Sequence, residues 1–95
     1  GMRISTVTDE ISETYQMPKG VYVREVALDS PAMEAGFQSG DVITQINGVS
    51  IAAAEDYEKL ILTLSDEQVI HITYERQGAE DYISLQSDVR VGVLE

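Results

Sequence analysis

The sequence contains no cysteine and only one histidine. Without cysteine, the chain has neither disulfide bonds nor thiolate metal ligands, and it gives no clue to its redox compartment. Basic residues are scarce too, because six Lys and Arg face seventeen Asp and Glu, a formal net charge of −11 at pH 7. Such a surface repels phosphate backbones and anionic membranes. We therefore expect neither nucleic acid nor an anionic membrane as a partner.

Long apolar segments are also missing. No run approaches the roughly 20 residues of a membrane-spanning helix, and no signal peptide is visible. The composition, 43% hydrophobic and 24% charged residues in a chain of 95, is typical of one small globular domain. Gly1-Met2 is typical of the scar left by protease cleavage in front of an expressed fragment. We therefore expect a piece of a longer protein.

Patterns for catalysis and metal binding are not found. The single histidine, His71, lies within a predicted strand, and no G-x-S-x-G elbow accompanies it. HExxH, calcium-loop and phosphate-loop spacings are absent as well. We interpret His71 as an ordinary strand residue, and four acids as solvated or helix-capping groups: Asp9, Glu10, Glu13 and Asp41. The sequence predicts no catalytic residue, no metal and no cofactor for this chain.

Alternation of apolar and polar residues predicts most of the secondary structure. Strands are predicted at residues 2–7, 21–26, 41–46, 49–51, 68–76 and 81–86. A short helix is predicted from Thr8, a good N-cap, to Tyr15. A longer one spans residues 53–64, where apolar residues recur every three or four positions at Tyr57, Leu60, Ile61 and Leu64.

The segment SPAMEAGFQSGDVITQING is rich in residues that fix the backbone. Ser30 and Pro31 suit the start of one helical turn, and Gly36 suits its end. Asn47-Gly48 predicts a tight turn between two strands. Taken together, the predicted fold is mainly β with two helices (α+β): a partial β-barrel of five to six strands, capped by a short and a longer helix.

Three segments, GVYVREV, SPAMEAGFQSGDVITQINGVSI and AEDYEKLI, occur in this order. They resemble a PDZ domain of the bacterial HtrA type, in its circularly permuted form. The resemblance implies a PDZ domain at residues 1–87, followed by a C-terminal tail at residues 88–95.

The same resemblance implies a function. Such domains bind extended peptides or protein C-termini by adding a strand to a sheet edge. In the HtrA family they regulate, or supply substrates to, an upstream trypsin-like serine protease domain. The parent protein is then a bacterial serine endopeptidase located outside the cytoplasm, in the envelope or at the cell surface, whereas this fragment is not itself an enzyme. The alternative is an interaction module of another envelope protein: a tail-specific protease, an intramembrane protease or a secretion component.

The resemblance also implies where a peptide would bind. The carboxylate-binding loop and first strand correspond to Gly1, Met2, Arg3 and Ile4, although the aromatic-apolar half of the family's loop motif is missing here. The opposite wall corresponds to the longer helix, with Ala54, Glu58, Ile61 and Leu62 toward the groove. Because the chain is so acidic, we expect ligands that are apolar at the last position and neutral or basic upstream.

Overall fold

The computed structural model describes residues 2–29, 33, 35–64 and 68–90. Its strands form one antiparallel sheet in the order β1-β2-β3-β5-β6, with β4 paired to β3. They are β1 (Met2–Thr6), β2 (Val21–Val26), β3 (Val42–Ile46), β4 (Val49–Ser50), β5 (Val69–Gln77) and β6 (Tyr82–Arg90). Two helices accompany them in the described part of the chain, α1 (Asp9–Tyr15) and α3 (Ala54–Leu62). The predicted α+β fold class is confirmed.

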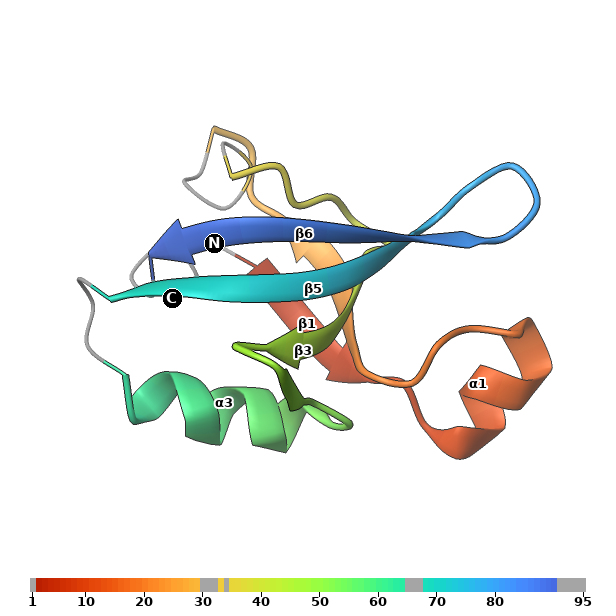
Figure 1. The fold of residues 1–95 in the computed structure, drawn as a ribbon. Coiled ribbons are helices and arrows are strands. Elements are labelled where there is room, and N and C mark those ends of the chain that lie inside the picture. The colour runs from red at the N-terminus through yellow and green to blue at the C-terminus, as the bar shows by residue number, and fades with distance from the viewer. Residues whose placement is uncertain (1, 30–32, 34, 65–67, 91–95) are drawn as a thin grey trace.

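The hydrophobic core lies between the sheet and α3, which runs alongside the strands (Figure 1). In β2, the fully buried Val21 and Val23 alternate with Tyr22 and Arg24, which point to the other face. Helix α3 supplies Tyr57 and Ile61, four residues apart on one side of the helix. The remaining buried members of the cluster are Phe37, Ile43, Ile46, Ile51, Ile70, Ile72, Tyr74 and Val89.

Helix α1 lies apart from this core, at the opposite end of the molecule from α3's C-terminus (Figure 1). The Thr8 side chain accepts a hydrogen bond from the Ile11 N–H (3.2 Å), as its N-cap position predicts. After the helix, Gly20 brings the chain against β3. A Cβ atom at Gly20 would lie 2.4 Å from the carbonyl oxygen of Ile43, so only glycine fits there without a backbone shift.

The predicted turn at Asn47-Gly48 is confirmed, but the predicted end of the last strand is not. Asn47 and Gly48 adopt φ angles of 51° and 79° and join β3 to β4, which confirms the tight turn. The predicted strand end at Gln86 is wrong, because β6 pairs with β5 as far as Arg90. Val89 is buried, so residues 88–90 of the predicted tail belong to the sheet instead. The polar run before Val89 obscured this, since only alternate residues of the strand face the core.

Two predictions concern residues that the structure does not describe. The helical turn predicted at Ser30–Ala35 rests largely on residues 30–32 and 34, and the last part of the predicted tail is residues 91–95. In the described ranges, no helix has the length and apolar character needed to cross a membrane.

Candidate functional site

Strand β1 lies at one end of the sheet. It pairs with β2 along one side, and among the described residues no strand pairs with its other side. Such an edge offers backbone N–H and C=O groups that can pair with an added strand. Helix α3 contacts β1, and the two are joined directly because the Ala54 N–H donates to Oγ1 of Thr6 (3.0 Å). The start of α3 is thereby fixed against the end of β1.

This bond also serves as the cap of α3. The N-cap position is Ala53, whose backbone is extended (φ −143°, ψ 156°) and whose side chain cannot accept a hydrogen bond. The first N–H groups of a helix need acceptors from outside the helix. Thr6, from a different element, supplies one of them.

The predicted groove residues occupy different environments. Ile4 is half-buried and packs against the core cluster, and Ile61 is 7% exposed within that cluster. Each of the two elements therefore contributes an apolar side chain to the same core. On α3, Ala54 is half-buried at the junction with Thr6, whereas Glu58 is exposed and Leu62 is 84% exposed.

At the start of β1, Arg3 is exposed and its Nε lies 3.6 Å from Oε2 of Glu25 on β2. Met2 pairs with Val26 through the backbone, and its side chain lies outside the description, as does Gly1. The register shifts between Arg3 and Ile4, which pair with Glu25 and Val23, so β2 contains a bulge there.

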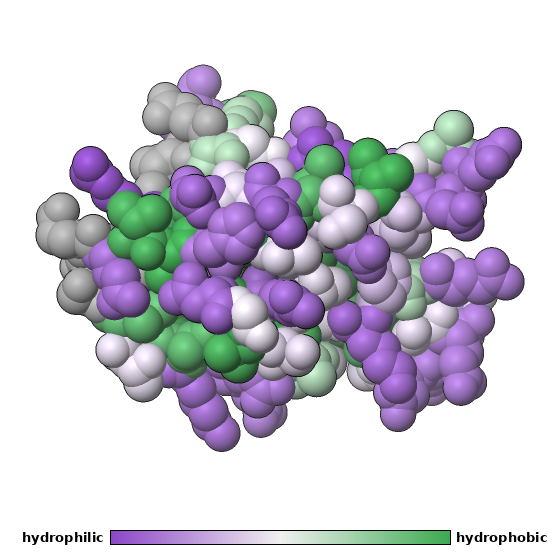
Figure 2. All heavy atoms as spheres, in the orientation of Figure 1, coloured by the Kyte–Doolittle hydropathy of each residue, from purple (hydrophilic) through white to green (hydrophobic). Residues whose placement is uncertain are grey.

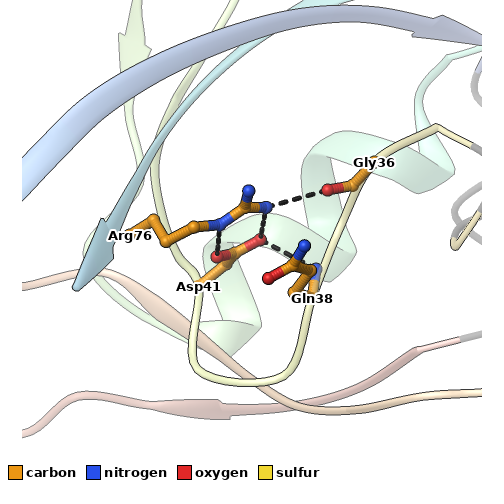
Figure 3. A network of polar contacts seen from close by, with 4 residues as sticks. All are labelled: Gly36, Gln38, Asp41 and Arg76. Atoms are coloured by element: carbon orange, nitrogen blue, oxygen red, sulfur yellow. Dashed lines mark hydrogen bonds and ion pairs between the residues drawn. The ribbon is translucent and has the colours of Figure 1, made fainter. Parts of the chain in front are cut away.

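A buried ion pair that we did not predict joins Asp41, directly before β3, to Arg76 on β5 (Figure 3). Asp41 is fully buried, so its assignment as a solvated or capping acid is wrong. Its carboxylate accepts two hydrogen bonds from Arg76 (2.8 and 2.9 Å) and one from the Gln38 N–H (2.8 Å). Arg76 also donates to the Gly36 carbonyl (2.8 Å). The hydrogen bonds with Asp41 are the main cause that raises the pKa of Arg76.

The ion pair holds the loop that positions β2. Gly40 N–H donates to the Val23 carbonyl, and Val23 N–H donates to the Asp41 carbonyl (both 2.8 Å). The Ser39 hydroxyl donates to the Arg24 carbonyl (2.8 Å). These contacts fall beside the bulge, opposite the first residues of β1. A fully buried carboxylate needs a cation, but the sequence does not reveal which of six basic residues provides it.

Tyr57 has a notable hydroxyl group. The side chain is 5% exposed, and no described atom hydrogen-bonds with its buried OH. Burial raises the pKa of this hydroxyl well above its usual value, and the negative charge of Glu58 adds to the effect.

The single histidine, His71, lies on β5, in line with its interpretation as an ordinary strand residue. The His71 side chain is 47% exposed, and its Nδ1 lies 2.7 Å from Oδ1 of Asp88 on the neighbouring strand. Among the described residues, no group of three or more His, Asp or Glu side chains is arranged to hold a metal ion.

Comparison with known proteins adds to this geometry. Residues 1–86 match the family model described as PDZ domain. A probable periplasmic serine endoprotease DegP-like from Marinomonas sp. (strain MWYL1) is 30% identical over 92 residues, 95% of this chain and 20% of the relative. Human serine protease HTRA3 is 33% identical over 73 residues, 68% of this chain and 16% of the relative. The chain thus spans about a fifth or less of the length of these relatives.

A solved structure is similar as well. It is the crystal structure of the HtrA3 PDZ domain bound to a phage-derived ligand, FGRWV. The two chains share 28% sequence identity with a TM-score of 0.75, over 95% of this chain and 80% of the other.

Proposed function

Since the chain belongs to the PDZ domain family, we propose that the open edge of β1 captures an extended peptide, with α3 as the opposite wall. The observation that carries the proposal is the side of β1 that no described strand pairs with, next to a helix fixed against the same strand. A peptide strand antiparallel to β1 directs its C-terminus toward Met2, where backbone N–H groups can hold a carboxylate. Its upstream residues then run toward Thr6 and Ala54.

The groove residues have distinct roles in this proposal. Met2, Arg3 and Ile4, together with Gly1, form the strand side that pairs with the peptide backbone. Ile61 underlies the last apolar side chain of the ligand, and Leu62 extends this apolar surface. Ala54 and Glu58 face residues further upstream in the ligand. Ile61 is only 7% exposed without a ligand. We therefore expect α3 and β1 to separate slightly when a ligand side chain enters.

The expected ligand is apolar at its C-terminus and neutral or basic upstream. The acidic chain, at −11, favours basic segments over acidic ones. The ligand of the HtrA3 PDZ domain, FGRWV, has this pattern, since it ends in an apolar residue and carries an arginine.

A titration with two forms of one peptide tests the proposal. FGRWV with a free C-terminus is compared with the same peptide as a C-terminal amide, by isothermal titration calorimetry and by amide chemical shifts. We expect the amide to bind at least about tenfold more weakly, because a charge-assisted contact is lost. The largest shifts are expected in β1 and α3. Shifts confined to other elements would contradict the proposed groove.

We further propose that the domain belongs to a serine endopeptidase of the HtrA type, in which it recognises substrates or regulates the protease. The similar DegP-like proteins are described as periplasmic, which supports a place outside the cytoplasm. A Gly-Asn-Ser-Gly-Gly-type nucleophile segment upstream in the same gene would support this parent protein. A gene without it would favour the alternative, an interaction module of another envelope protein.

A further inference from the structure

Helix α1 presents apolar side chains to solvent rather than to the core. None of its residues is buried, and Ile11 and Tyr15 are 38% and 69% exposed. Four positions apart, they share one side of the helix. Both line a hollow of about 360 Å³, whose mostly apolar wall is completed by Ser5, Thr6, Val7, Met17, Tyr22 and Arg24.

This hollow meets the proposed peptide groove only at Ser5 and Thr6, the C-terminal end of β1. Tyr22 and Arg24 alternate with the buried Val21 and Val23, so they lie on the face of β2 that points away from the core. Helix α3 packs on the core face instead. A ligand of the first hollow therefore leaves free the space between α3 and the first residues of β1, Met2 to Ile4.

A second hollow, of about 400 Å³, adjoins the first. Tyr15 lines both, and the second extends from the end of α1 to the turn between β5 and β6. It is visible in Figure 2 between two hydrophilic lobes at the right-hand edge. Its lining includes three acids, Glu75, Glu80 and Asp81, and no basic residue. Burial raises the pKa of Tyr82 in the same wall, and Tyr22 and Glu75 contribute to this rise.

The two hollows differ in the charge of their linings. The one cation in their linings, Arg24, lies in the first hollow, and all three acids lie in the second. Lys19 follows Pro18 of the second lining in the sequence, but its Nζ is paired with Oδ1 of Asp9 (2.8 Å). A ligand with an apolar group at one end and a positive charge at the other therefore matches the two hollows in only one orientation.

We propose that these hollows, together the α1 cleft, bind a basic segment of a partner protein, with an apolar or aromatic side chain in the first hollow and a lysine or arginine in the second. The segment needs no free carboxylate. The second hollow is lined by three acids, which would repel a terminal carboxylate, and it has no basic residue to neutralise one. The α1 cleft would give the domain a second contact with this partner, beyond the C-terminal end of β1.

The test uses a peptide that lacks both terminal charges. Acetyl-Gly-Phe-Gly-Lys-Lys-Gly-amide is titrated into the domain and amide shifts are followed, with acetyl-Gly-Phe-Gly-Glu-Glu-Gly-amide as the control. We expect shifts at Ile11, Tyr15 and Tyr82 with the lysine peptide, little change at Ile4 and Ile61, and weaker binding of the glutamate peptide. Equal binding of the two peptides, no binding, or shifts confined to β1 and α3 would overturn the proposal.

Charge reversal provides a matched comparison. Glu80→Lys places a cation in the second hollow and is expected to weaken the lysine peptide about fivefold or more. Glu10→Lys makes the same change of net charge at an exposed α1 residue that lines neither hollow, and it is expected to weaken binding less than about twofold. Equal losses would contradict a site in the cleft. Binding of FGRWV at the β1 edge, measured on both variants, separates a failure of this proposal from a failure of the proposed groove.

Discussion

Asp41, directly before β3, and Arg76 on β5 are linked through a carboxylate that water does not reach. The Asp41 side chain is 0% exposed and that of Arg76 is 28% exposed. The guanidinium also lies 5.8 Å from the centre of the Tyr74 ring, which in turn contacts Phe37. A buried charge of this kind costs desolvation energy, and the pair is tolerated because its hydrogen bonds satisfy the carboxylate.

Removing one partner is therefore expected to be costly. Arg76→Met keeps most of the apolar stem but leaves Asp41 unpaired, and we expect a loss of about 2 to 3 kcal/mol in the free energy of unfolding, measured with urea. Arg3→Met breaks an exposed pair and is expected to cost less than about 1 kcal/mol. Adding Asp41→Asn to Arg76→Met removes the unpaired charge and should recover part of the loss. Equal effects of the two arginine substitutions would contradict the role of the buried pair.

Tyr57 gives the opposite expectation. Its hydroxyl is buried without a partner in the described part of the chain, so removing it removes a desolvation cost. Tyr57→Phe is expected to leave stability unchanged or raise it by about 1 kcal/mol in the same urea assay. Tyr15→Phe, at an exposed position, is the control and should change little. A loss of about 1 kcal/mol in Tyr57→Phe would mean that the hydroxyl has a partner after all.

Among the elements, α3 depends on β1 for its first hydrogen-bond acceptor. Thr6→Val removes the hydroxyl that caps Ala54 while keeping the side-chain shape, and we expect a loss of about 1 kcal/mol in the free energy of unfolding. Ala53→Asp introduces a local cap at a residue whose backbone is already extended. In the double variant, stability should be restored.

Peptide binding gives this pair of variants a second readout. The local cap restores helix α3 but not its attachment to β1, so affinity for FGRWV is expected to stay reduced in the double variant. If Ala53→Asp does not restore stability, the loss in Thr6→Val does not come from a missing cap. If it restores affinity as well, the attachment of α3 to β1 does not contribute to binding.

Features set by neighbouring residues were predicted from the sequence, whereas contacts between distant residues were not. Strand β2 was predicted with the observed bounds, because its alternation and its flanking turn residues lie within one short segment. The turn at Asn47-Gly48 was predicted for the same reason. Partners distant in sequence were not: Asp41 and Arg76 are 35 residues apart. The end of β6 was missed because its last core residue, Val89, follows three polar residues.

The candidate site divides in the same way. The resemblance to PDZ domains indicated β1 and α3 as the two sides of the groove, and the structure brings these elements together. The sequence did not indicate the bond between Thr6 and Ala54, because any hydroxyl or carboxylate from another element could have capped an alanine. It also gave no sign of the α1 cleft, which depends on how α1 is placed beside the hairpin of β5 and β6.

At the scale of the whole molecule, charge decides which peptides approach. With six basic residues against seventeen acidic ones, every ligand meets a negative field before it reaches a groove. Salt weakens this field over distance. The Debye length falls from about 10 Å at 0.1 M salt to about 3 Å at 1 M. Contacts made by apolar side chains and by backbone pairing do not weaken in the same way.

Charge selection should therefore vanish with salt while groove binding persists. Variants of FGRWV extended at the N-terminus with two lysines or two glutamates are compared by calorimetry from low to high salt. At about 50 mM salt we expect the lysine peptide to bind about tenfold more tightly. At about 1 M salt the two affinities should converge on that of unextended FGRWV. A preference that survives high salt would mean instead that the added lysines contact acids directly. Glu58, which we propose to lie on the wall of the groove, is then the first residue to substitute.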